Sequence, residues 1–247
     1  MKIIATVEAR MTSSRLPGKV MMTALGRPML AHLIRRLKAV PSLDGIVLAT
    51  TVNATDDVLA EFAESEGIGV FRGSEEDVMG RVLGAAESAG ADVIVEITGD
   101  CPLIDPDLVE QTIRVFRRNE KAVYCANSFI SSYPDGMDTQ VFTFDALKTS
   151  AAMTDDPLDR EHVSRHIVQH PDLFPHVYLI APPSLHWPGL GLTLDEPKDY
   201  DLISTLIEHF GEESPLFGCG DVIQALRQHP EWLEINSAVG RKDARPT

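Results

Sequence analysis

The residues best suited to chemistry lie in one segment near the N-terminus, residues 8–19, with the sequence EARMTSSRLPGK. An apolar stretch with strand character precedes it, so the segment leaves the carboxyl edge of a predicted sheet, where open α/β sheets bind ligands. Three cations, Arg10, Arg15 and Lys19, accompany small hydroxyl residues and a glycine. A triphosphate requires such cations, together with the exposed backbone N–H groups of a tight loop. The sequence therefore predicts a triphosphate-binding loop, with a solvated surface turn as the alternative.

The loop differs from two common phosphate motifs. It matches neither the Walker A pattern nor G-x-G-x-x-G, which argues against P-loop NTPases and dinucleotide-binding enzymes. The hydroxyl residues Ser13 and Ser14 are predicted nucleotide contacts, and so is Thr51 at the end of another predicted strand. In a reaction that releases pyrophosphate, the three cations would stabilise the departing group electrostatically.

Two aspartates stand where apolar stretches end. Asp100 follows residues 93–97 after a short turn with a glycine, and Asp195 follows residues 190–194, another predicted strand. Carboxylates at neighbouring strand ends suit Mg²⁺, which takes few protein ligands and leaves room for phosphate oxygens. Each has a structural alternative, because Asp100 can cap a turn and Asp195 or Glu196 can cap the following helix. Together with the loop, Asp100 and Asp195 predict a Mg²⁺ site, and Asp100 is also a predicted catalytic residue.

A second polar segment, YPDGMDTQ, mixes turn formers with hydrogen-bonding side chains just before an apolar stretch. Arrays of this kind recognise polyhydroxylated sugars, although a plain loop is the alternative. The predicted sugar contacts here are Tyr133, Asp138 and Gln140. Arg160 and Glu161, at the start of a predicted helix, are candidates for substrate contacts or for a dimer surface.

Alternating strand and helix patterns position these residues in the first half of the chain. The predicted strands are residues 2–7, 45–51, 69–72 and 92–97. The predicted helices are 28–40, 55–65 and 77–89, followed by one that Asp105 opens as N-cap, with Pro106 at its first position. This alternation predicts an α/β fold with a mixed, mostly parallel sheet and helices on both faces.

The pattern becomes irregular after about residue 119. Predicted strands follow at 122–126, 138–144, 176–180 and 190–194, with helices near 160–169, 197–209 and 220–227. We therefore predict one domain over residues 1–240. Within it, residues from about 120 to 190 form a partly antiparallel insertion for sugar binding or dimerisation, and residues 241–247 form a frayed tail.

Composition limits the possible partners. The formal net charge of the 247 residues is −15, which disfavours duplex DNA and anionic lipid as partners. No run of about 18 apolar residues exists, so no membrane span is predicted. The three cysteines stand far apart without metal-like spacing, and the N-terminus does not resemble a secretory signal. A cytoplasmic protein with free thiols is expected.

The loop and its continuation also carry a family resemblance. After a first strand, A-R-M-x-S-x-R-L-P-G-K and then G-R-P-M-L at residues 26–30 resemble the cytidylyltransferases that activate sugar acids. This group includes CMP-Kdo synthetase and acylneuraminate cytidylyltransferase, and the most similar branch is named after the spore coat polysaccharide biosynthesis protein SpsF. The resemblance spans essentially the whole chain. It implies a three-layer nucleotide-diphospho-sugar transferase fold of GT-A or Rossmann-like type, CTP and a sugar acid of nonulosonic or Kdo type as substrates, Mg²⁺, and a homodimer.

The resemblance also implies residue roles. Gly99-Asp100 resembles the G-D metal motif of the family, and Leu194-Asp195-x-Pro197 resembles its late D-x-P-x-D segment. Asp199 is expected in the first turn of the following helix, where its charge suits the helix dipole. The stretch RGSEEDV resembles a loop that related enzymes place over the nucleobase. Ser74 and Arg81 are therefore implied base contacts, with the alternative that Ser74 only caps the following helix.

At two positions the chain departs from that branch. Glu8 stands where the branch often has Gln, and an acid there has to turn away from the phosphates. Gln140 stands where the branch often has Glu, a change that removes a charge and alters which sugar fits.

The favoured hypothesis is that a sugar hydroxyl attacks the α-phosphorus of CTP, with pyrophosphate leaving in line, in surface polysaccharide biosynthesis. Another nucleotidyltransferase, using a different nucleoside triphosphate or sugar, is one alternative. A glycosyltransferase is a second, since Asp105-Pro106-Asp107 has the letters of a D-x-D metal motif. A nucleotide-binding protein without catalysis would share the loop and lack metal dependence.

Overall fold

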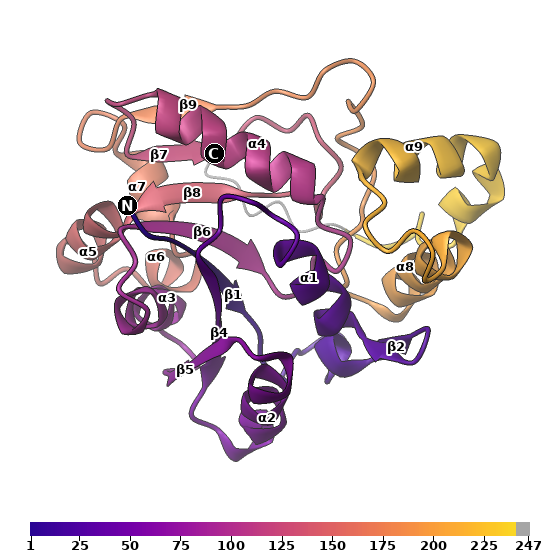
Figure 1. The fold of residues 1–247 in the computed structure, drawn as a ribbon, viewed down its shortest axis with the longest axis horizontal. Coiled ribbons are helices and arrows are strands. Elements are labelled where there is room, and N and C mark those ends of the chain that lie inside the picture. Colours follow the sequence, from indigo (N-terminus) through magenta and orange to yellow (C-terminus); the bar gives the residue numbers. More distant parts are fainter. Residues whose placement is uncertain (241–247) are drawn as a thin grey trace.

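A seven-stranded sheet forms the centre of the computed structural model, which describes residues 1–240 (Figure 1). Across the sheet the strands run in the order β5-β4-β1-β6-β8-β7-β9. Only β8 runs antiparallel to its neighbours, so the sheet is mixed and mostly parallel, as predicted. The strands are β1 (Ile3–Glu8), β4 (Gly45–Thr51), β5 (Gly69–Gly73), β6 (Val93–Thr98), β7 (Tyr124–Ala126), β8 (Gln140–Thr143) and β9 (His176–Tyr178).

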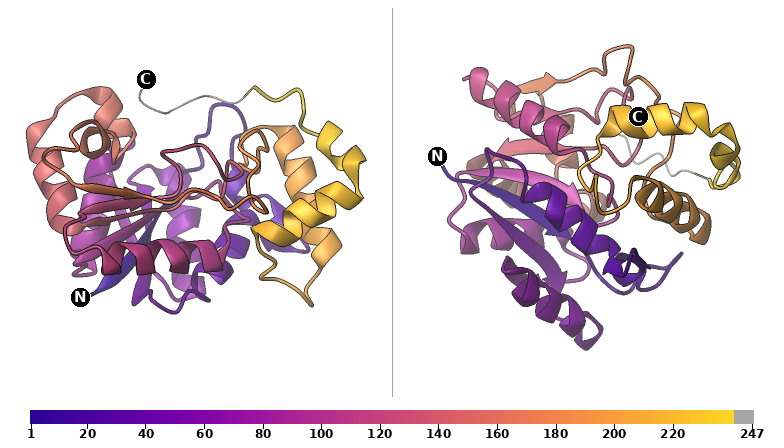
Figure 2. Two further views of the ribbon diagram at one scale, coloured as in Figure 1. Left: turned by 90° about the horizontal axis from the view of Figure 1, so that it is seen from above. Right: turned by 45° about the vertical axis from the view of Figure 1, so that its right-hand side comes forward.

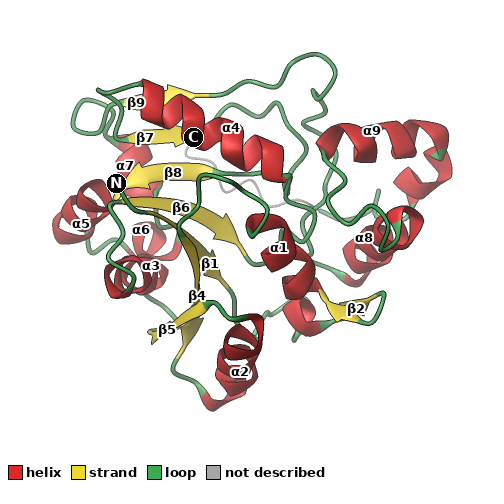
Figure 3. Ribbon diagram, viewed as in Figure 1, coloured by secondary structure: helices red, strands yellow, loops and turns green. Residues whose placement is uncertain are grey.

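Helices cover both faces of this sheet, because successive residues of each strand point to opposite faces and both sets are apolar (Figures 2 and 3). One face packs on α1 (Met29–Leu37), α2 (Asp57–Glu66) and α4 (Pro106–Arg118). The other face packs on α3 (Val78–Ser88), α5 (Phe144–Met153) and α7 (Arg165–Gln169), with α6 (Pro157–Glu161) beside α3. The predicted three-layer fold is confirmed.

A third apolar cluster lies to the side of the sheet. It joins α8 (Pro197–Phe210) and α9 (Cys219–Gln228) to the start of α4 and to residues 190–194. Figure 1 shows these two helices on the side toward which β6 points. The short elements are the β2 (Thr23–Ala24) and β3 (Arg27–Pro28) hairpin and the 3-10 turns η1 (Lys19–Met21), η2 (Ala54–Asp56) and η3 (Pro230–Glu234).

The start of α4 shows whether Asp105-Pro106-Asp107 serves as a D-x-D metal motif. Asp105 is its N-cap, since the side chain accepts a hydrogen bond from the backbone N–H of Asp107. The other oxygen of Asp105 accepts from the backbone N–H of Cys219, which ties α4 to α9. The letters of the D-x-D motif are therefore explained by helix capping, and the carboxylate that would bind metal is used inside the fold.

Several predictions for the second half were wrong. Residues 190–194 form no strand; they make a single β-bridge, between Gly191 and Asp135, because only a few backbone hydrogen bonds join the two segments. The helix predicted near 160–169 is two short helices, broken at Val163, where φ is +28°. Helix α5 and the β2–β3 hairpin were not predicted.

Two further predictions concern the chain as a whole. The tail predicted at residues 241–247 lies outside the described part of the chain. Among residues 1–240, every helix is too short or too polar to span a lipid bilayer.

Candidate active site

The predicted phosphate loop leaves the end of β1 and closes on itself. The backbone N–H of Gly18 donates to the carbonyl oxygen of Met11 at 2.9 Å, and the backbone N–H of Met11 donates to Asp56 Oδ1 at 2.8 Å. Gly18 has φ +72°, a left-handed conformation that favours glycine. The loop is thus held at both ends, and Lys19 follows directly in η1.

Side chains from three distant parts of the chain meet beside this loop. The Lys19 ammonium lies 2.9 Å from Asp100 Oδ2 and 3.0 Å from Asp195 Oδ1. Arg15 also reaches Asp195, with its NH2 atom 2.8 Å from Oδ1. The structure therefore brings together two of the three predicted cations and both predicted metal ligands.

Close backbone packing positions Asp100. Gly99 donates its N–H to the carbonyl oxygen of Glu8 at 2.8 Å, and a Cβ at Gly99 would lie 2.5 Å from that same oxygen. Only glycine permits this approach of the two strand ends. Leu194 in turn donates its N–H to the carbonyl oxygen of Asp100 at 2.8 Å, which places Asp195 beside Asp100.

Helix capping at α8 is carried by the neighbours of Asp195. Glu196 is the N-cap, and Asp199 completes a capping box by accepting from the backbone N–H of Glu196 at 2.9 Å. Asp199 also accepts from the N–H of Asp195 at 3.2 Å. The alternative that Asp195 itself caps the helix is wrong, so its carboxylate is available to face Lys19.

The electrostatics of this cluster favour charged side chains. Burial alone would raise the pKa of Asp100, but the adjacent Lys19 ammonium and the Thr98 hydroxyl hold that pKa below its ordinary value. Burial likewise opposes the charge on Lys19, yet the carboxylates of Asp100 and Asp195 raise the pKa of its ammonium. The lowered pKa keeps the Asp100 carboxyl group ionised at neutral pH, as a ligand of a divalent cation has to be.

The donor set fits magnesium. Two carboxylates already share one positive charge, the Lys19 ammonium, which shows that this position accommodates a cation between them. Hard carboxylate oxygens in small number are what Mg²⁺ takes from proteins that also bind phosphates.

At the other end of the loop, Glu75 occupies the place of an anion. Its carboxylate accepts hydrogen bonds from Thr12 at 2.5 Å, Asn53 at 2.6 Å and Arg10 at 3.0 Å. The bonds from Thr12 and Asn53, with the charge of Arg10, lower the pKa of Glu75. A phosphate group would satisfy the same donors, so Glu75 marks an anion position.

Two other predicted nucleotide contacts, Thr51 and Arg81, have buried side chains that form hydrogen bonds within the protein. Thr51 is buried and donates its hydroxyl to Asp56 at 2.5 Å. The buried Arg81 guanidinium donates to the carbonyl oxygens of Ala49 and Ser74.

The Ser74 hydroxyl itself accepts from the N–H groups of Glu76 and Asp77, each at 3.2 Å. The alternative that Ser74 caps α3 is wrong, because the N-cap is Asp77. Of the two loop serines, Ser14 is exposed, and the hydroxyl of Ser13 accepts from the N–H of Leu16 at 3.4 Å.

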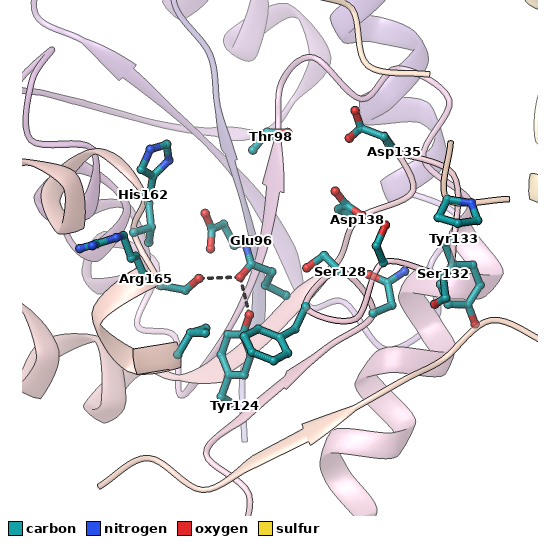
Figure 4. A pocket seen from close by; sticks show the side chains of 18 of the residues that line it. Glu96, Thr98, Tyr124, Ser128, Ser132, Tyr133, Asp135, Asp138, His162 and Arg165 are labelled. Atoms are coloured by element: carbon teal, nitrogen blue, oxygen red, sulfur yellow. Dashed lines mark hydrogen bonds between the residues drawn. The ribbon is translucent and has the colours of Figure 1, made fainter. Parts of the chain in front are cut away.

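A cavity of about 610 Å³ lies over the ends of β1 and β6 (Figure 4), since Glu8, Glu96 and Thr98 are in its lining. Its lining includes Thr98, two residues before Asp100, and Gly191, four residues before Asp195. Among the predicted sugar contacts, the cavity is lined by Tyr133, Asp138, Gln140 and Glu161. The carbonyl oxygen of the Gln140 side chain accepts from the hydroxyls of Tyr124 at 2.6 Å and Ser164 at 2.5 Å.

Arg160 lies away from this lining. Its guanidinium donates to the carbonyl oxygens of Ala151 and Thr154 and lies 3.6 Å from Asp77. The side chain thus braces α6 against neighbouring segments.

Sequence reasoning missed two acids of the site. Asp56 is fully buried and accepts hydrogen bonds from the backbone N–H of Met11 and from the hydroxyls of Thr50 and Thr51. Glu96 lines the cavity from the middle of β6. The acid inside the apolar run VIVEIT could have indicated this role, because buried parallel strands rarely contain a charged residue that has no structural or functional role.

Comparisons with known proteins identify the family of the chain. Residues 4–209 match the family model described as cytidylyltransferase. The chain is 32% identical over 235 residues to the spore coat polysaccharide biosynthesis protein SpsF of Bacillus subtilis, with 93% of this chain and 95% of that protein covered.

Two further proteins are similar. Over 124 residues the chain is 36% identical to 8-amino-3,8-dideoxy-manno-octulosonate cytidylyltransferase of Shewanella frigidimarina, covering 48% of this chain and 49% of that protein. The solved structure of a cytidylyltransferase from Leptospira borgpetersenii superposes with a TM-score of 0.89 at 30% identity, covering 94% of this chain and 96% of that chain. The chain belongs to the cytidylyltransferase family and is a nucleotidyltransferase.

Proposed function

We propose that this enzyme transfers the cytidylyl group of CTP to a hydroxyl of a sugar acid, in a Mg²⁺-dependent reaction that releases pyrophosphate. The observation that carries the proposal is the meeting of Lys19, Asp100 and Asp195, close in sequence to Thr98 and Gly191 in the lining of a cavity with many hydrogen-bonding side chains. Family membership supports CTP as the nucleotide, and the relatives whose names include an octulosonate support a sugar acid as the acceptor.

Each cation of the loop has a separate place along the triphosphate in this proposal. Lys19 and Arg15 stand at the acids, where the α-phosphate and the bridging oxygens would lie. Arg10 stands with Thr12 at the anion position that Glu75 fills, which suits the distal phosphates. Neutralising pyrophosphate as it departs is electrostatic catalysis, and it requires no proton transfer by these side chains.

Asp100 and Asp195 would hold Mg²⁺. When bound, the ion offsets the charge that develops on the phosphoryl oxygens during in-line displacement. The protein's own contribution is to present both carboxylates side by side, from two segments joined by a backbone hydrogen bond.

The cavity would orient the sugar. A volume of about 610 Å³ falls within the range of roughly 300–1,000 Å³ typical of small-molecule pockets. Hydroxyl and amide side chains dominate one stretch of the lining, where Asn127, Ser128, Ser131 and Ser132 lie. Arg165 and His162 line another side (Figure 4). The Arg165 guanidinium is paired with Asp159 but has further N–H donors, which would bind the carboxylate of a sugar acid.

The test is pyrophosphate release with each of four nucleoside triphosphates, with and without Mg²⁺, against a panel of sugars. The panel contains nonulosonic acids, 3-deoxy-manno-octulosonate, its 8-amino-8-deoxy analogue, and simple hexoses. We expect release with CTP alone, requiring both Mg²⁺ and a sugar acid. UDP release from a UDP-sugar would favour a glycosyltransferase instead, and release with equal rates from all four nucleotides would refute CTP as the substrate.

A further inference from the structure

Two acidic side chains lie on the sheet beneath the cavity. Glu8 ends β1 and Glu96 lies in the neighbouring strand β6, where it is paired in register with Thr6. Because side chains alternate between the faces of a strand, Glu8 and Glu96 project from the same face of the sheet. Both line the cavity, and Figure 4 shows Glu96 among the lining side chains. Glu8 thus turns inward, away from the phosphate loop.

These carboxyl groups lack hydrogen-bond partners. Both carboxylate oxygens of Glu8 and the Oε2 atom of Glu96 are buried without one, and Glu96 as a residue is only 5% exposed. Buried polar atoms in native proteins are nearly always paired, so orphaned acceptors beside a cavity indicate a missing donor. Arg81 is close enough for its charge to lower the pKa of Glu8, but its Nε and Nη1 donate to backbone carbonyl oxygens.

Acidic residues outnumber basic ones in the lining of the cavity. Besides Glu8 and Glu96, its described lining contains the acid Glu161 and two aspartates, Asp135 and Asp138, which have interactions of their own. Arg165 is the one permanently charged cation of this described lining, and it is already paired with Asp159.

Without a ligand, protons compensate part of this charge. Burial raises the pKa of Glu96 to about 8. Burial, followed by repulsion from Glu96, raises the pKa of Glu8 well above its ordinary value. A cationic ligand could replace those protons.

We propose that Glu8 and Glu96 recognise a positively charged amino group on the sugar, so that the preferred acceptor is an amino sugar or an amino sugar acid. This proposal rests on the proposed function for the assignment of the cavity to the sugar. An ammonium group carries three N–H donors and a full charge, and it can therefore satisfy both orphaned carboxylates at once. A hydroxyl has a single proton to donate and leaves at least one buried acceptor unpaired, which is the basis of strong discrimination.

Sugar binding in the absence of CTP tests the proposal, since no reaction then enters the measurement. Isothermal titration calorimetry at neutral pH compares matched probes: 8-amino-3,8-dideoxy-manno-octulosonate against 3-deoxy-manno-octulosonate, and glucosamine against glucose. The wild-type chain is expected to bind at least one amino probe roughly tenfold or more tightly than its hydroxyl partner, as expected for a desolvated charge pair. Failure of every amino probe to bind more tightly than its partner overturns the proposal.

Variants localise the effect. Glu8→Gln, Glu96→Gln and the double variant keep the size of the side chains and remove the charge, so the amine preference is expected to fall with each change and to vanish in the double variant. Glu120→Gln, an exposed acid outside the cavity lining, is the control and should retain the preference. An unchanged amine preference in the double variant would also overturn the proposal.

Pyrophosphate release, measured in parallel, separates this proposal from the proposed function. Release with hydroxyl sugars and no preference for amines leaves the cytidylyltransferase reaction standing and removes the amine site. An amine preference in binding without pyrophosphate release from any nucleotide supports the amine site and refutes the proposed reaction.

Discussion

Replacing Lys19 by Met tests how the two acids are held together. The ammonium of Lys19 lies 2.9 Å from Asp100 and 3.0 Å from Asp195, and its side chain is only 12% exposed. At an effective dielectric constant of about 20, each contact has a gross attraction of roughly 5 kcal/mol, most of which desolvation offsets. Met keeps an unbranched side chain one atom shorter than that of Lys, and leaves the two carboxylates facing each other without the cation.

The loss in the free energy of unfolding depends on how far Asp100 and Asp195 are exposed to solvent and on their other partners. Removing one partner of a buried ion pair typically costs about 3–5 kcal/mol. The Asp100 and Asp195 side chains are 26% and 18% exposed, and Arg15 still compensates Asp195, so solvent and Arg15 reduce that cost. We expect Lys19→Met to lower the free energy of unfolding by about 2 kcal/mol in the absence of divalent cations.

Magnesium should restore much of that loss. In the variant Mg²⁺ enters a site with two carboxyl side chains and no competing ammonium. A ligand that binds only the folded state stabilises that state. Urea unfolding followed by circular dichroism, with MgCl₂ or with NaCl of equal ionic strength, measures both effects. Lys38→Met is the matched control: Lys38 forms an exposed pair with Glu66, so it should cost less than about 1 kcal/mol and respond to Mg²⁺ as the wild type does. Equal Mg²⁺ stabilisation of wild type and Lys19→Met would refute the reasoning.

Three further predictions concern single carboxylates. Asp100→Asn should lower the turnover for pyrophosphate release by roughly a hundredfold or more, because a bound metal ion stabilises the transition state by several kcal/mol. The circular dichroism spectrum should not change, and turnover at the wild-type rate would exclude Asp100 as a metal ligand. Glu75→Ala frees Arg10 for the triphosphate, so the KM for CTP should fall by up to about fivefold, the worth of a surface ion pair; a raised KM would indicate that Glu75 contacts substrate directly. For Glu96, the raised pKa of about 8 penalises the ionised form in the folded state, so the wild type should lose stability relative to Glu96→Gln as the pH rises from about 4.5 to 8. The change is at most roughly 5 kcal/mol at 1.36 kcal/mol per pKa unit, and a constant difference across that range would contradict burial as the cause.

The first half of the fold was predictable because each strand there is an apolar run followed by an amphipathic helix. Residues 45–51 were predicted with the same bounds as β4, and the capping role of Asp105 was read from Asp-Pro at a helix start. In the second half, short strands and loops replace that pattern. Residues 190–194 are apolar like a strand, yet they pack on α8 and α9 and pair with a loop at one bridge, which no local periodicity reveals.

For the site, residue type and position after β1 and β6 pointed to Arg15, Lys19 and Asp100, because parallel strands end at one edge. Asp195 was expected after a strand that the structure lacks, yet the hydrogen bond from Leu194 to Asp100 still places it in the cluster. The features of the site that were not predicted depend on strand register and on packing between segments far apart in the sequence. The shared face of Glu8 and Glu96 follows from the pairing of β1 with β6, and the anion position at Glu75 follows from the approach of its loop to Arg10.

The equilibrium binding of CTP with and without Mg²⁺ tests the central claim most directly, in wild type and in the Asp100→Asn/Asp195→Asn variant. Without Mg²⁺, the two acids repel the triphosphate, so the variant should bind CTP more tightly than the wild type. With Mg²⁺, the acids hold the ion against the phosphates, so the wild type should bind more tightly. A crossing of the two affinities is the predicted result, and an identical Mg²⁺ effect in both proteins would contradict the assignment of these acids to a metal–triphosphate site.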